Sequence, residues 1–208
     1  MTEIVVTGSA EQRLPADRAE LQLSASHAGP ERQPVVTAAG TVHAQLVSRA
    51  QTLVAAGVAE SYTAEPVTTY TNSWRTEAGD QIVEHRANVS VAIDLTALDQ
   101  VGALTTEFAE GGTDARVTWK LSDGARDAVL RELRAAAVAD AQAAADDYAA
   151  ALGRSVKELR ELRDASAGRG VGPIGAPRFA MMADAGGPPE VTVHDIGVEV
   201  SIEARFEA

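Results

Sequence analysis

The chain has 208 residues, of which 45% are apolar and 23% are charged, a balance typical of a globular protein and not of a collagen or a disordered tail. Its 18 basic residues face 30 acidic residues, so the net charge is −12. A field of that sign repels phosphate backbones and anionic lipid, and we therefore expect no nucleic-acid partner.

Cysteine is absent, which excludes disulfides, thiol nucleophiles and thiolate metal sites together. No stretch approaches the roughly 20 apolar residues that a helix needs to cross a bilayer. The N-terminal residues Met-Thr-Glu-Ile-Val-Val lack the features of a secretory leader. As written, the sequence predicts a cytoplasmic protein without membrane insertion, and an exported one only if a leader was removed.

The first part of the chain predicts two strands and a helix. The β-branched stretch Ile4–Gly8 indicates one strand, and alternating apolar residues over Ala19–Ala25 indicate a second strand with one buried face. From Val35 to Ala56 the apolar residues recur at helical spacing. Gly57 follows, where a glycine would end the helix.

The middle of the chain predicts a hairpin and a second helix. Ser61–Trp74 and Ile82–Asp94 read as two long strands that a short turn separates. Thr96 and Asp99 have spacing like that of a capping box, at the start of a helix that reaches about Glu110.

A strand over Ala115–Leu121 is expected next, and then a helix of about 29 residues that Ser122 or Asp123 caps and that ends at Leu152-Gly153. Asp140 interrupts the apolar side of this helix and is expected to pair with an arginine. The predicted buried stripe steps by three or four residues and consists of Leu130, Leu133, Ala137, Ala141, Ala144, Tyr148 and Leu152.

Three segments complete the chain. Val156–Leu162 is a candidate strand, and residues 165–190, rich in Ala, Gly and Pro, read as a long loop. Val191–Phe206 alternates as a strand does, but its parity changes near His194, which predicts a bulge or a strand switch there.

The predicted order is β-β-α-β-β-α-β-α-β-β. Antiparallel, half-buried strands with amphipathic helices on one face make an α+β architecture. We expect one domain over residues 1–208.

Motifs that carry chemistry are weak. Gly170–Gly175 fits GxGxxG, but it lies in the Pro- and Gly-rich stretch and opens no helix, so a flexible loop is favoured and no cofactor is expected. The four histidines have no metal-site spacing, and no nucleophile signature is present. His85 falls on the apolar parity of its strand, which favours a packed residue. We predict no catalytic, cofactor-binding or metal-ligating residue.

The loop at 165–190 holds one apolar cluster, formed by Phe179, Met181 and Met182. Long loops without secondary structure are usually functional or disordered, and an exposed apolar cluster favours contact with a neighbouring subunit. These three residues are therefore candidate oligomer contacts, and the alternative, that they cover the protein's own sheet, stays equally open.

A series of segments, taken in order, resembles the SIMPL (DUF541) family. The segments are Ile4 to Ala10, Pro15 to Leu21, Leu53 to Val58, Thr63 to Tyr70 with its Glu65-Pro66, His85 to Val91, Leu121 to Asp123, Ala151 to Gly153, and Pro189 to Val193 with the alternating strand that follows. Family members include periplasmic proteins linked to oxidative-stress defence, an immunogenic envelope protein that assembles into rings, and animal proteins of inflammatory kinase signalling.

The resemblance implies an α+β fold and a homo-oligomer, and it implies no established enzyme activity, cofactor or catalytic residue. As written, the sequence is expected to lack the family's usual leader, and it has His85 where relatives often place tyrosine.

Two functional hypotheses follow. The first is a non-catalytic, self-assembling protein that supports stress tolerance or scaffolds partners through sheet edges and the 165–190 loop. The second is a small-ligand-binding protein or unrecognised hydrolase with a pocket between helices and sheet, which requires convergent titratable groups. We favour the first.

Overall fold

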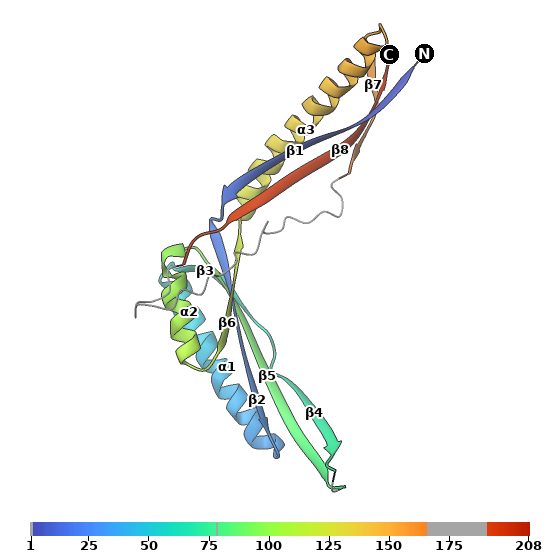
Figure 1. Ribbon diagram of the computed structural model, residues 1–208. Helices are drawn as coiled ribbons and strands as arrows, with labels where there is room; N and C mark the ends of the chain where they lie inside the picture. Colours follow the sequence, from blue (N-terminus) through green and yellow to red (C-terminus); the bar gives the residue numbers. More distant parts are fainter. Residues whose placement is uncertain (1, 78, 166–190) are drawn as a thin grey trace, which may run out of the picture. The chain divides into compact units, whose positions relative to one another are not determined.

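The computed structural model describes residues 2–77, 79–165 and 191–208. Contacts between Cα atoms divide the chain into two compact units (Figure 1). Of the described residues, unit 1 contains 2–16, 121–165 and 194–208, and unit 2 contains 17–120 and 191–193. Each unit has its own antiparallel sheet and its own helical cover, so the predicted α+β class is confirmed.

Unit 1 is a three-stranded sheet covered by one long helix. Its strands are β1 (Glu3–Pro15), β8 (Asp195–Glu207) and β7 (Glu158–Asp164), with β8 in the centre. The terminal strands β1 and β8 pair along their full length, from Glu3 opposite Glu207 to Pro15 opposite Asp195. Both ends of the chain therefore hold this unit together.

The long helix α3 (Asp123–Ala151) packs on β1 and β8 through small side chains (Figure 1). Its buried residues step by four: Val129, Leu133, Ala137, Ala141, Ala145 and Ala149. The predicted stripe is right at Leu133, Ala137 and Ala141. Leu130 and Ala144 are only half-buried, and at the C-terminal end Tyr148 is 61% and Leu152 is 60% exposed. Four residues turn 400° around a helix, 40° more than one full turn. A row of residues four apart therefore winds slowly around α3, whereas the predicted stripe mixed steps of three and four and departs from that row.

Gly8 of β1 is the point of closest approach between the strand and α3. A Cβ atom built on Gly8 would lie 2.1 Å from the carbonyl oxygen of Ala137 and 2.7 Å from the Cβ of Ala141. Only a residue without a side chain fits there.

The two ends of α3 and the carboxylate of Asp140 have identified hydrogen-bond partners. The Ser122 hydroxyl accepts a hydrogen bond from the backbone N–H of Ala125, so Ser122 is the N-cap. At the other end Gly153, at φ +68°, closes a Schellman motif in which the N–H of Arg154 donates to the carbonyl of Ala149. We had expected Asp140 to pair with an arginine, but no arginine among the described residues does so. The Asp140 carboxylate accepts the Ser9 backbone N–H at 2.9 Å.

Unit 2 is a five-stranded sheet with helices on one face. Strands β3 (Ala59–Ala64), β5 (Gln81–Leu95), β2 (Arg18–Gly29) and β6 (Asp114–Lys120) lie in that order, and β4 (Thr68–Arg75) also pairs with β5. The cover consists of α1 (Arg32–Ala55), the 3₁₀ turn η1 (Leu98–Gln100) and α2 (Val101–Glu110).

The core of unit 2 lies between this sheet and its helices. The helix-facing side chains of β2 and β5 are buried: Ala19, Leu21, Leu23, Ala25, Ala87, Val89, Val91, Ile93 and Leu95. They are the apolar half of the alternation that the sequence shows. The helix α1 ends as predicted, because Gly57, at φ +72°, makes a Schellman motif with Val58 bonded to Leu53.

One predicted strand is interrupted. The expected strand over residues 61–74 is two strands, β3 and β4, which pair with the same edge of β5 on either side of Pro66. The register changes across the break, from Ala64 opposite Val91 to Thr68 opposite Asn88. Proline lacks an N–H for the ladder and is confined to edges and bulges, so it divides an edge strand at this point.

Two smaller expectations are also wrong. Thr96 does not cap a helix; its hydroxyl donates to the carbonyls of Gly57 and Val58, and α2 begins after η1 without a side-chain cap. The last strand begins at Asp195 and pairs without a register shift, so the change of parity near His194 marks the start of the strand.

We predict that Gly8→Ala lowers the free energy of unfolding of unit 1 by roughly 3 kcal/mol or more, because the added methyl overlaps the backbone of α3. Urea unfolding followed by circular dichroism measures this. Gly124→Ala is the matched control in the same unit, since a Cβ on Gly124 meets nothing within 4 Å. Equal stability of the two variants would contradict the packing described here.

Candidate functional site

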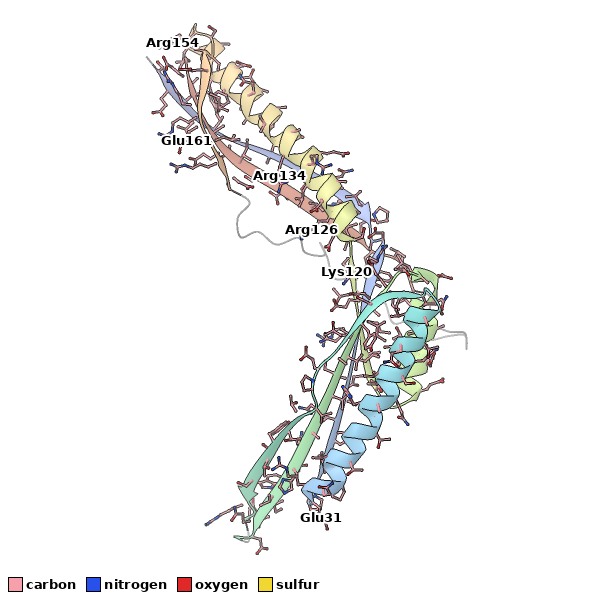
Figure 2. The ribbon with its side chains drawn as sticks, turned by 180° about the vertical axis from the view of Figure 1, so that it is seen from behind. Glu31, Lys120, Arg126, Arg134, Arg154 and Glu161 are labelled. Carbon is pink, nitrogen blue, oxygen red and sulfur yellow. The ribbon has the colours of Figure 1, made fainter. Side chains whose placement is uncertain are left out.

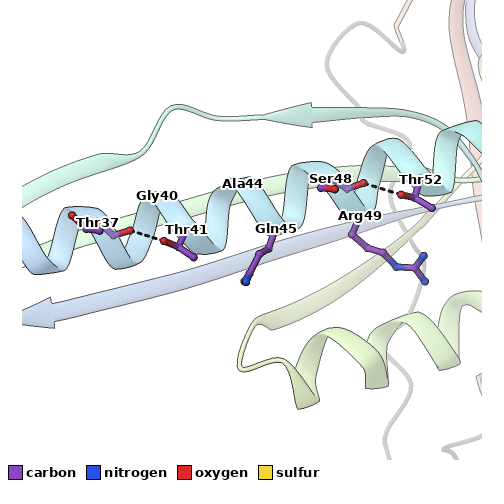
Figure 3. Close-up of a pocket in the computed structure, with 8 residues that line it drawn as sticks. All are labelled: Thr37, Gly40, Thr41, Ala44, Gln45, Ser48, Arg49 and Thr52. Carbon is purple, nitrogen blue, oxygen red and sulfur yellow. Dashed lines mark hydrogen bonds between the residues drawn. The ribbon is translucent and has the colours of Figure 1, made fainter.

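A wide hollow lies on the solvent side of α1, in unit 2 (Figure 3). It has a volume of about 810 Å³ and is lined by Thr37, Gly40, Thr41, Ala44, Gln45, Ser48, Arg49 and Thr52. Two of its hydroxyls are already engaged: Thr41 donates to the Thr37 carbonyl and Thr52 to the Ser48 carbonyl, both at 3.0 Å.

Arg49 is the one charged residue among these lining residues, and α2 supplies its partner. Its Nε and Nη2 donate to the two carboxylate oxygens of Glu107 at 2.7 and 2.8 Å. These hydrogen bonds, which Arg49 donates and Glu107 accepts, lower the pKa of Glu107 and raise the pKa of Arg49. The pair ties α1 to α2, and the described lining residues supply no second titratable group for acid–base chemistry.

Three of the four histidines make hydrogen-bond contacts within their own unit. His85 is half-buried, and its Nδ1 is 3.0 Å from the Thr71 hydroxyl on the neighbouring strand. His43 lies on α1, with Nε2 3.1 Å from the carbonyl oxygen of Glu65. The carbonyl of His194 accepts the N–H of Ala16. Within the described residues, no group of three His, Asp or Glu side chains could hold a metal ion.

The outer strands of both sheets present backbone groups that no other described strand pairs, and most of these edges are protected. Asp140 covers the outer edge of β1 at Ser9. Five of the seven residues of β7 are charged, among them Glu161, labelled in Figure 2, and a register shift bends the strand. Charges and bulges of this kind prevent an edge from pairing with another chain.

The outer strands of unit 2 differ from one another. The edge strand β6 carries Asp114, Arg116 and Lys120, the last labelled in Figure 2. The short strand β3 has a register shift beside Glu60. The strand β4 has no such protection: over Thr68–Trp74 it has no charge and no proline, and it pairs with β5 without a register shift.

All eight residues of β4 are exposed, and two of them are aromatic. Tyr70 is 45% and Trp74 is 47% exposed, and both lie on the sheet face opposite the helices, where Trp74 is paired with the exposed Ile82. Hydrogen bonds to Glu84 and to Tyr70 raise the pKa of Arg86 on the same face. The exposed edge of β4, with these two rings, is the candidate functional site.

The SIMPL family model, described as a protein of unknown function (DUF541), matches residues 4–206. The chain belongs to the SIMPL family. The match extends over both compact units. No curated protein matches this SIMPL chain. Within the part of the chain that the structure describes, none of its helices is long and apolar enough to cross a membrane.

The predicted contact residues Phe179, Met181 and Met182 lie outside the described residues, as does Gly170–Gly175. Sequence reasoning missed the edge of β4. The signal was present in Thr-Thr-Tyr-Thr-Asn-Ser-Trp, an uncharged stretch of strand-forming residues with aromatics four apart, which begins two residues after Pro66.

The Arg49–Glu107 pair makes a prediction about pH. The pKa of Glu107 is lower in the folded protein, so the pair contributes stability above the unfolded-state pKa near 4.5, and this is lost as pH falls through the folded value. The side chains are 38% and 47% exposed, so we expect at most about 1 kcal/mol. Comparison of urea unfolding at neutral and acidic pH should show a smaller loss in Glu107→Gln than in wild type. Glu110→Gln is the control, and an unchanged pH dependence in Glu107→Gln would contradict the assignment.

Proposed function

We propose that this SIMPL protein is a non-catalytic, self-assembling protein whose copies join through the exposed edge of β4. The observation that supports this most is the contrast between β4 and the other edge strands: β4 alone among the described edges combines full exposure, an uncharged stretch and two aromatic rings. An unprotected edge of this kind is a template for pairing with another chain.

The cellular role that we propose for the assembly is a scaffold in stress tolerance, as the family resemblance suggests. Chemistry at sulfur contributes little to it. The chain has no cysteine and only three methionines, so neither thiol exchange nor methionine scavenging has much capacity.

The alternative, a small-ligand-binding protein or hydrolase, requires two or more titratable groups that converge in a pocket. The hollow on α1 offers Arg49, whose charge Glu107 already neutralises. No observation at this hollow favours the alternative, which stays a prediction.

Solution mass tests the proposal. Light scattering at micromolar concentration should give a mass above the 21.6 kDa of one chain. Ser73→Pro should reduce the mass to that of a monomer, because proline removes an N–H of β4 and blocks the edge. Ser73→Ala keeps the N–H and should leave the mass unchanged. Circular dichroism verifies that both variants fold, and a wild-type monomer would overturn the proposal.

A further inference from the structure

We infer that β4 pairs with β4 of a second copy, antiparallel, around a twofold axis that passes between the two Asn72 residues. The inference rests on the proposed self-assembly and specifies its partner, its register and its side-chain contacts. An identical partner needs a self-complementary surface. If one residue contacts a second residue of the other copy, that second residue must contact the first residue of the other copy in the same way.

The backbone of β4 determines which of its residues can bond outward. At the hairpin turn the N–H of Thr76 donates to the carbonyl of Asp80 at 2.9 Å, so the backbone groups of Thr76 point toward β5. Direction alternates along a strand, and Trp74, Asn72 and Tyr70 therefore also bond inward. The free N–H and C=O groups belong to the intervening residues, which are Thr69, Thr71, Ser73 and Arg75.

Antiparallel pairing on this edge must place outward-bonding residues opposite one another. Centring the pair on Asn72 sets Thr71 opposite Ser73 of the second copy, and Thr69 opposite Arg75 of the second copy. By symmetry this makes four hydrogen-bonded pairs, each of which exchanges two N–H···O bonds. Seven of the eight residues of β4, Thr69 to Arg75, then lie opposite β4 of the second copy.

The same register brings the exposed rings together. Tyr70 of each copy lies opposite Trp74 of the other, on the face away from the helices, at positions where the backbones do not bond and side chains are closest. A shift by two residues would place Tyr70 opposite Asn72 and separate the rings. Aromatic pairs across strands are among the more favourable, so the rings select the Asn72-centred register.

Charge is compatible with this partner. The protein carries a net charge of −12, which opposes self-association in general. The strand β4 contains no carboxylate, and its one charge is Arg75. One cost is that Arg75 approaches Arg32 of the second copy. Within each copy the Nη2 of Arg32 lies 3.4 Å from the hydroxyl of Thr69, the residue that Arg75 of the other copy faces. Both side chains are exposed, and salt screens their repulsion.

The absence of cysteine makes the register directly testable. In the proposed dimer Asn72 faces itself across the axis at a non-bonded position, where Cα atoms lie about 4.5 Å apart, within the range for a disulfide. The two Thr71 residues are offset along the strands, at a Cα separation of roughly 8 to 9 Å from the strand spacing and rise, which is too far. The test compares Asn72→Cys with the matched control Thr71→Cys under mild oxidation at micromolar concentration.

Asn72→Cys should form a disulfide-linked dimer at least about tenfold faster than Thr71→Cys, as read on a non-reducing gel. Light scattering of the reduced variants separates the possible failures. An oligomeric mass with equal cross-linking, or with faster cross-linking of Thr71→Cys, overturns the register and leaves self-assembly standing. A monomeric mass for the cysteine-free wild type overturns both. Adding Trp74→Ser to Asn72→Cys should slow cross-linking, and an unchanged rate would overturn the aromatic selection.

Discussion

Each sheet of this protein buries one face under helices, and the constraint that remains is the open backbone at its edges. Outer strands carry N–H and C=O groups that a further strand could use, so an edge is either satisfied, protected or available. In unit 1 the carboxylate of Asp140 satisfies one group at Ser9, and charge protects the opposite strand β7. In unit 2 the edge of β4 is available, and the proposed function depends on that difference.

The contact of α3 with β1 explains how Asp140 reaches its position. Gly8 lets the helix backbone approach the strand, with the alanine row of α3 between them. At that short separation a side chain as short as aspartate on the flank of the helix spans the distance to the N–H of Ser9. The close packing at Gly8 and the protection of the strand edge at Ser9 therefore depend on each other, because neighbouring residues of β1 and of α3 make both contacts.

Much of this fold can be predicted from the spacing of apolar residues and from the glycines that end helices. Alternation identified β2, β5 and most of β8, and glycines at positive φ marked the ends of α1 and α3. What local pattern could not show is which backbone groups meet. Asp140 reads as a misplaced charge until Ser9 is known to be its partner, 131 positions away. Thr96 reads as a cap until the carbonyls of Gly57 and Val58 lie beside it.

The candidate site was missed for a related reason. An apolar cluster is visible in a sequence, whereas an unpaired edge is a property of the sheet, and Tyr70 and Trp74 look like ordinary strand aromatics until β4 is known to be outermost. Pro66 separates β3 from β4. It ends β3 where the helices cover the sheet and lets the chain resume, in a new register, along the remaining length of β5. The result is an eight-residue strand held on one side only, with its aromatic side chains on the face that no helix covers. In a chain with a net charge of −12, the absence of carboxylates from this strand makes it the described edge at which pairing costs least in charge repulsion.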